Sequence, residues 1–114
     1  MIEPKKQDFT LFQGATWEHA FVVLNEVTLL PLDISGCTAK LQAREDVDDV
    51  TPVIDISGQI GGANGQVKFV IDPIMSEGKT WETSGYDAEL TWPGGKKDKL
   101  GYGKFKLKRE YTTS

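Results

Sequence analysis

Residues 32–44 constrain the fold of this chain more than any other stretch. A turn signal, Asp-Ile-Ser-Gly at 33–36, leads into a segment in which small or apolar side chains alternate with polar ones. The apolar set is Ala39, Leu41 and Ala43, and the polar set is Lys40, Gln42 and Arg44. Strict period-two alternation predicts a strand with one buried and one wet face. The wet face, with Lys40 and Arg44, is left for water or for a neighbouring subunit.

Six further segments have the composition of short strands and are separated by clusters of Gly, Pro, Asn and Asp. They are residues 8–12, 16–24, 53–57, 66–71, 86–92 and 99–108. Segment 16–24 is apolar on both faces, so we expect it to be a central strand. Only the region around 74–78 favours a helical turn. Seven short strands spaced about 8–12 residues apart favour an all-β, antiparallel sandwich or small barrel, because parallel strands need crossover helices.

Length and composition are those of one globular domain. The chain has 114 residues, of which 39% are hydrophobic and 26% charged. We expect an N-terminal arm at 1–7, a single domain at 8–110 and a loose tail at 111–114. No apolar run approaches the ~20 residues that span a bilayer, and the N-terminus lacks a secretory signal. Cys37 is the only cysteine, which fits synthesis in a reducing cytoplasm.

The last predicted strand contains a change of parity. Leu100 and Tyr102 share one face, whereas Phe105 and Leu107 share the face of opposite parity. Both pairs can face the core only if one extra residue lies between them. Glycines at 101 and 103 suit such a bulge, so we predict a bulge between 101 and 104. Lysines 104, 106 and 108 then lie on the outer face, beside the acidic residues 87 and 89 of the preceding strand.

Charge is segregated along the chain. Residues 96–110 carry seven basic and two acidic side chains, whereas the rest carries six basic and fifteen acidic ones. Lys104, Lys106 and Lys108 are therefore candidates for contact with an acidic partner. No aromatic-flanked basic motif accompanies them, which disfavours nucleic acid. The plain interpretation is the solvated face of a terminal strand.

No motif in the chain points to catalysis, to a cofactor or to a metal. His19 and Cys37 would need to meet in space to act together, and Cys37 has only Lys40 near it in sequence to lower its pKa. The acidic stretch 45–49 lacks the glycine and distant glutamate of an EF-hand. The glycine-rich stretch 58–65 precedes a strand pattern rather than the helix a phosphate loop needs. We therefore expect no catalytic, cofactor or metal site.

Tryptophans supply the remaining candidates for binding. Trp81 lies in a polar loop and is the best candidate for an exposed aromatic anchor against a partner. Trp17 is a second candidate, either for a protein interface or for stacking on a sugar. Trp92 is expected to close the apolar face of its strand.

Three stretches together resemble a family of tailed-phage proteins. FQGATW at 12–17 is similar to a "QGxTW" start, LDISGCTAKLQAR at 32–44 resembles "DLTGYTAxxQxR", and YDAELTWPGG at 86–95 resembles "YDLELTxPDG". In this order they are similar to small virion β-domains of phages and prophages, including the N-terminal domains of upper baseplate proteins that carry receptor-binding tips. Cys37 departs from the pattern, where an aromatic residue is usual.

The resemblance implies an immunoglobulin-like β-sandwich that is not an enzyme. It implies a structural protein, made in the host cytoplasm and located in the virion, that docks to tail, baseplate or fibre proteins. Symmetric copies in the particle or a homo-oligomer are expected partners, and no membrane is implied. The alternatives are a capsid decoration or head–tail connector protein, or a module that binds carbohydrate or the host surface.

Overall fold

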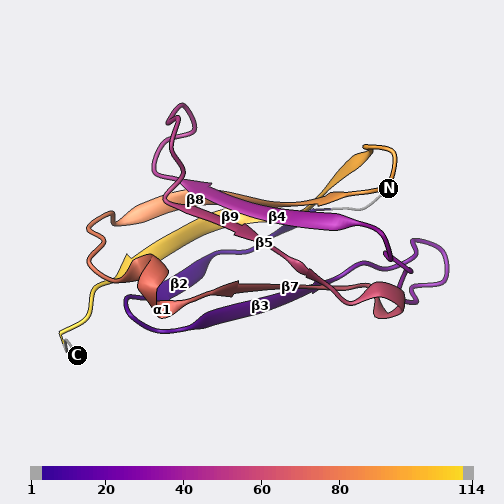
Figure 1. Cartoon of the computed structure of the whole chain (residues 1–114), viewed down its shortest axis with the longest axis horizontal. Coiled ribbons are helices and arrows are strands. Elements are labelled where there is room, and N and C mark those ends of the chain that lie inside the picture. Colours follow the sequence, from indigo (N-terminus) through magenta and orange to yellow (C-terminus); the bar gives the residue numbers. More distant parts are fainter. Residues whose placement is uncertain (1–3, 112–114) are drawn as a thin grey trace.

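The computed structural model describes residues 4–111 and shows two β-sheets packed face to face (Figure 1). The larger sheet has the order β1-β9-β8-β4-β5, with β2 also paired to β9, and the smaller has the order β3-β7-β6. The strands are β1 (Lys5–Lys6), β2 (Phe9–Phe12), β3 (Trp17–Val22), β4 (Thr38–Arg44), β5 (Ile54–Ser57), β6 (Gln59–Ile60), β7 (Gln66–Ile71), β8 (Thr83–Thr91) and β9 (Lys97–Lys108). A 3-10 turn, η1 (Gly62–Asn64), and one helical turn, α1 (Pro73–Ser76), complete the described chain.

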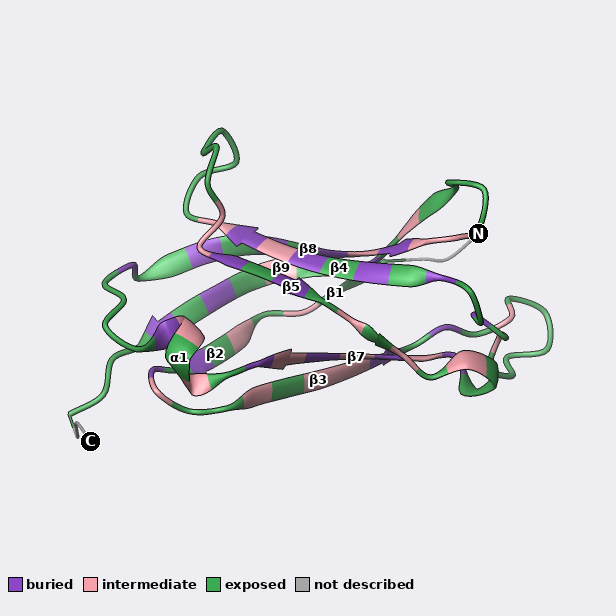
Figure 2. Ribbon diagram, in the orientation of Figure 1, coloured by how far each residue is buried: buried purple, intermediate pink, exposed green. Residues whose placement is uncertain are grey.

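The predicted all-β sandwich is therefore confirmed, and the predicted strands and helical turn are present with shifted ends. Buried residues recur along the strands of both sheets (Figure 2), and their apolar side chains form one core cluster. The alternating segment behaves as its pattern predicts, since Ala39, Leu41 and Ala43 are buried while Lys40 is exposed. In the turn before it, Asp33 Oδ1 accepts a hydrogen bond from Ser35 N–H at 2.9 Å, and Ile34 is fully buried.

The sheets are mostly, but not wholly, antiparallel. Both β1 and β2 run parallel to β9, with Lys5 opposite Gly101 and Phe9 opposite Phe105. Crossover helices are not required for this pairing because the two partners come from opposite ends of the chain. The described part of the expected arm at 1–7 thus belongs to the larger sheet, while residues 1–3 and 112–114, including most of the expected tail, lie outside the described residues.

The prediction that segment 16–24 is a central strand is wrong. Its strand, β3, lies at the edge of the smaller sheet, and β7 is the central strand. The apolar residues on its outer side are accessible, with Val22 54% exposed. The reason is topological: the N-terminal strands pair with β9 and not with β3.

A bulge in β9 is confirmed, but its predicted position is wrong. Ala88 lies opposite Gly101 and Glu89 opposite Lys99, so Leu100 is the extra residue. Phe105 and Leu107 face the core as expected, whereas Tyr102 is turned outward and is 45% exposed. The lysines at 104, 106 and 108 lie on the outer face, as predicted.

The two glycines of β9 make room for the N-terminal strands. A Cβ at Gly103 would overlap Gln7 O, and a Cβ at Gly101 would lie 2.7 Å from Phe21 Cε1 and 2.9 Å from Lys5 O. Gln7 N–H, between β1 and β2, donates to Tyr102 O at 2.9 Å. These glycines therefore allow close approach of backbone and ring.

A buried glutamine fixes one end of the sandwich. Gln13 Nε2 donates to Lys79 O at 2.8 Å and to Ser76 O at 3.2 Å, and its Oε1 accepts from Glu110 N–H at 3.1 Å. Gly14 N–H donates to Ser76 Oγ at 2.9 Å. The turn after β2, the segment that follows α1 and the chain after β9 are thereby joined.

We predict that Gly103→Ala lowers the free energy of unfolding by about 1–3 kcal/mol, because the new methyl group overlaps Gln7 O. Urea unfolding followed by tryptophan fluorescence measures the change. Gly85→Ala is the control, since the nearest atom to a Cβ there is 3.9 Å away, and its effect should stay within about 0.5 kcal/mol. Equal effects of the two variants would contradict this role of Gly103.

Candidate protein-docking surface

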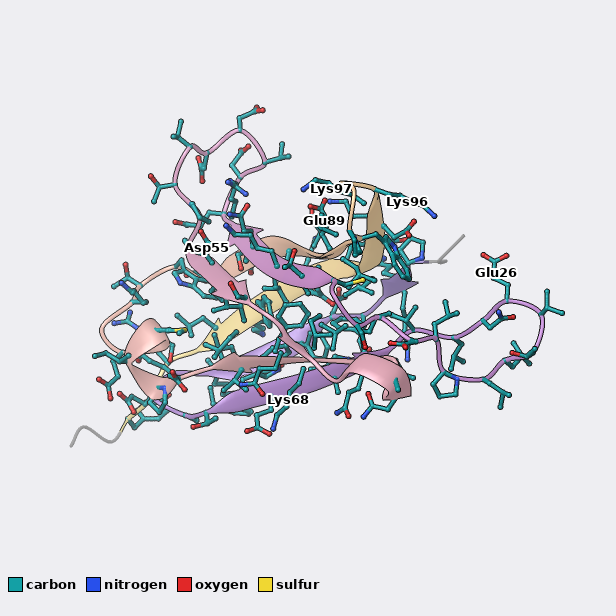
Figure 3. The ribbon with its side chains drawn as sticks, turned by 45° about the vertical axis from the view of Figure 1, so that its right-hand side comes forward. Glu26, Asp55, Lys68, Glu89, Lys96 and Lys97 are labelled. Atoms are coloured by element: carbon teal, nitrogen blue, oxygen red, sulfur yellow. The ribbon has the colours of Figure 1, made fainter. Side chains whose placement is uncertain are left out.

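A protruding hairpin follows β3 at residues 24–31. Leu24 and Pro31 form an isolated bridge, and Asn25 N–H donates to Leu30 O at 2.8 Å. Asn25 Oδ1 accepts from Val27 N–H at 2.8 Å and from Thr28 N–H at 2.9 Å. In Figure 3, Glu26 marks this hairpin, which projects beyond the end of the sheets. Asn25 O also accepts from Leu29 N–H at 2.9 Å, so Asn25 fixes the conformation of the hairpin with two backbone and two side-chain hydrogen bonds.

The hairpin presents an apolar surface to solvent. Val27 is 90% exposed, Leu29 68% and Leu30 64%, and Leu24 and Val22 continue this surface onto β3. Leu29 adopts a φ of 59°, in the left-handed region that costs a non-glycine residue roughly 1 kcal/mol. A contiguous exposed apolar surface on a well-defined loop is typical of a protein-binding site.

A groove of about 840 Å³ runs beside the hairpin, along the outer edge of β3. Its lining includes Pro4, Lys5, His19, Phe21, Leu29 and Leu100. The groove therefore opens on the side of the sandwich where the N-terminal residues and β3 form the two sheet edges (Figure 1). We call the hairpin and this groove together the docking surface.

His19 lies within a row of aromatic rings beside the groove. Its ring centroid is 4.8 Å from that of Phe9, 4.7 Å from that of Phe21 and 6.1 Å from that of Trp17. Burial, and then the positive charge of Lys5, lowers the pKa of His19 below 6.5. The imidazole is consequently neutral near pH 7 and contributes to packing.

Cys37 has the environment of a structural thiol. It is buried at the start of β4, and burial together with the charge of Asp33 raises the pKa of its thiol. A thiol with a raised pKa is a poor nucleophile at neutral pH. Within residues 4–111 no hydrogen bond joins Cys37 to His19, and no group of three or more His, Cys, Asp or Glu side chains could hold a metal ion.

The prediction that Trp81 is an exposed anchor is wrong. Trp81 is only 6% exposed and belongs to the core. The hydrogen bonds from Gln13 to Ser76 and Lys79 hold the preceding segment against the sandwich, which turns Trp81 inward. Trp17 is half-buried, with its ring centroid 4.9 Å from that of Phe9 and 5.1 Å from that of Phe105. Trp81 therefore offers no free face for stacking on a sugar, and the ring of Trp17 is partly covered by its aromatic neighbours.

The basic candidates lie on the outer face of the larger sheet but do not form one cluster. Lys40 pairs with Asp55 at 3.4 Å, and Arg44 Nε donates to Asp49 O at 3.0 Å. The acidic residues of β8 pair with Lys97 and Lys99, as Figure 3 shows for Glu89 and Lys97, rather than with the lysines expected. Among the described residues, no ion pair involves Lys104, Lys106 or Lys108.

The docking surface itself is not predicted by the sequence. The pattern of residues 25–36 indicates a turn region, although VTLLPL at 27–32 is an apolar run where a loop is expected. An apolar loop between two strands is the available signal. The open edge of β3 has no such signal, because it depends on which strand the N-terminus joins.

Comparisons with known proteins add a distant likeness. No protein-family model and no curated protein matches the chain. Among solved structures, the fold is similar to a variant of the superoxide reductase (neelaredoxin) from Ignicoccus hospitalis, with 14% identity and a TM-score of 0.42, over 96% of this chain and 78% of that one. In the described range 4–111, no helix has the length and apolarity to cross a membrane.

We predict that protonation of His19 destabilises the fold. Because the folded-state pKa is lowered below 6.5, the unfolded chain binds the proton more tightly, and this part of the stability is lost as pH falls from about 7.5 to about 5. Urea unfolding at both pH values should show a larger loss for the wild type than for His19→Gln, which stays neutral. An identical pH dependence in both proteins would refute the prediction.

Proposed function

We propose that the protein is a structural docking module of a tailed-phage virion that binds tail, baseplate or fibre proteins through protein–protein contacts. The observation that carries the docking role is the exposed apolar hairpin at 24–31, with Val27, Leu29 and Leu30 in solvent. The virion context comes from the resemblance of residues 12–17, 32–44 and 86–95 to phage virion domains.

The geometry of the hairpin favours binding. Burial of an exposed Val or Leu side chain contributes about 1.5–3 kcal/mol before the costs of association. Asn25 already holds the backbone of the hairpin through its hydrogen bonds to Val27 and Thr28. Less conformational entropy is therefore lost when a partner covers these side chains.

Two alternative functions are a carbohydrate-binding module and a capsid decoration or connector protein. A carbohydrate-binding module is disfavoured, because Trp81 is buried and the ring of Trp17 packs against the rings of Phe9, His19 and Phe105. A capsid decoration or connector protein would use the same kind of surface, so copy number in the particle distinguishes it from a tail protein.

We predict that purified particles contain the protein at about six to a few dozen copies, as the cyclic symmetry of a tail implies. Quantitative mass spectrometry of particles separated from host proteins by density gradient measures this number. A few hundred copies would place it in the capsid instead, and its absence from particles would overturn the virion role.

A second prediction concerns the hairpin. Val27→Asp places a charge on the docking surface, so incorporation into particles should fall at least about tenfold, while thermal stability stays unchanged because the side chain is exposed. Val47→Asp is the matched control, since Val47 is 89% exposed on a different loop. Normal incorporation of the Val27 variant would show that the hairpin does not carry docking.

A further inference from the structure

We infer that β3 is a pairing edge that binds antiparallel to β3 of a second copy of this chain, joining two smaller sheets into one continuous sheet. The inference does not depend on the proposed function, because that function rests on the exposed hairpin at 24–31, whereas this pairing rests on the backbone of β3, which borders the groove of the same surface. It rests on the backbone of β3, on the absence of Pro and Lys from this strand and on the complementarity of its own sequence.

The outer edge of β3 has backbone groups available for pairing. Val23 N–H donates to Gly65 O at 2.8 Å, which continues the register in which Val22 lies opposite Gln66 of β7. Backbone groups alternate sides along an antiparallel strand. Glu18, Ala20 and Val22 therefore direct their N–H and C=O groups away from β7, where the described chain 4–111 places no further strand.

The return strand of the hairpin leaves this edge open. Leu32 N–H donates to Val23 O at 2.9 Å, and Val23 also uses its N–H to bond Gly65. Both groups of one strand residue point to the same side, so residues 31–32 lie on the β7 side of β3. The outer edge is bordered by the groove instead.

Other sheet edges in the described chain carry features that discourage pairing. β1 has two residues, both lysines, and follows Pro4, and β2 on the same edge has only four residues. β5 and β6 are short, with four and two residues, and the chain passes from one sheet to the other at Gly58. Prolines, lysines and short strands are the usual protections of an edge. β3 has six residues and neither Pro nor Lys, and its one charged carboxylate, that of Glu18, already pairs with Lys68 of β7 at 3.5 Å.

The sequence of β3 is complementary to itself when two copies run antiparallel about Ala20. Ala20 then lies opposite Ala20 of the second copy, and Glu18 lies opposite Val22 of the second copy. No like charges face each other directly, and the strand pairs with itself about a two-fold axis, as an isologous interface requires. The smallest side chain of β3, Ala20, lies on that axis. Each of these opposed pairs can exchange two backbone hydrogen bonds.

This pairing also accounts for the partly exposed inner face of β3. In the same register, His19 lies opposite Phe21 of the second copy, and Trp17 lies opposite Val23 of the second copy. His19 and Trp17 are half-buried in the single chain. Cross-strand pairs of aromatic and β-branched residues are among the favourable ones in sheets, so a second copy would cover rings that one chain leaves partly exposed.

Charged substitutions at Ala20 test whether two copies of β3 pair. Ala20→Glu puts two carboxylates face to face on the two-fold axis, whereas within one chain the new carboxylate lies opposite Lys68. We expect the wild type to dimerise between micromolar and millimolar concentration in sedimentation experiments, and Ala20→Glu to raise the dissociation constant about fivefold or more. A mixture of Ala20→Glu with Ala20→Lys should restore dimers, because opposite charges then meet.

Gln59→Glu is the matched control. Gln59 lies opposite Lys68 on β6, so this variant adds the same charge beside the same lysine but at the other edge of the sheet, and it should dimerise like the wild type. Amide exchange provides a second readout, with protection of Ala20 N–H rising with protein concentration. A wild type that stays monomeric, a dimer indifferent to Ala20→Glu, or pairing of β3 only with a strand of another protein would each overturn the inference.

Discussion

The side-chain amide of Gln13 holds together segments that are distant in the chain. Its hydrogen bonds reach residues 63, 66 and 97 positions away, at Ser76, Lys79 and Glu110. A buried amide with an unmet donor or acceptor costs about 1–3 kcal/mol per group, so the three segments are favoured only in this mutual arrangement. The inward position of Trp81 follows from it, because the chain leaves Lys79 already bound to the sandwich.

Pairing of the chain ends determines which surfaces remain open. β1 and β2 add to β9, where Gly101 and Gly103 leave space for the backbone of the N-terminal strands. This pairing of β1 and β2 with β9 completes the larger sheet but leaves β3 without a neighbour on its outer edge among residues 4–111. On the opposite side, continuity of β5 with β6 through Gly58 connects the two sheets. One side of the sandwich is thus closed by the chain, and the other bears the groove and the bare edge.

Local patterns predict the strands and the buried face of β4 well, because period-two alternation at Ala39, Leu41 and Ala43 is a property of the strand itself. Parity also predicts that β9 contains an extra residue, but not that Leu100 is that residue. The nearby glycines suggest a bulge in the sequence, whereas their role depends on the approach of Gln7 and Phe21. The burial of Trp81 and the edge position of β3 are not predicted, for the same reason. Both depend on contacts between residues far apart in sequence, and the periodicity of a segment carries no information about such contacts.

The stretches that resemble phage virion domains have structural roles in this chain. Gln13 and Gly14 join the end of the sandwich, and the turn at 33–36 is closed by Asp33 and Ser35. Tyr86 Oη donates to Gln7 O at 2.5 Å, and burial raises the pKa of Tyr86 to about 12, so this donor stays protonated. A resemblance carried by such residues bears on the fold more than on the partner. The choice of partner would then depend on the hairpin at 24–31 and on the outer edge of β3, where side chains such as Val27 and Val22 lie outside the core.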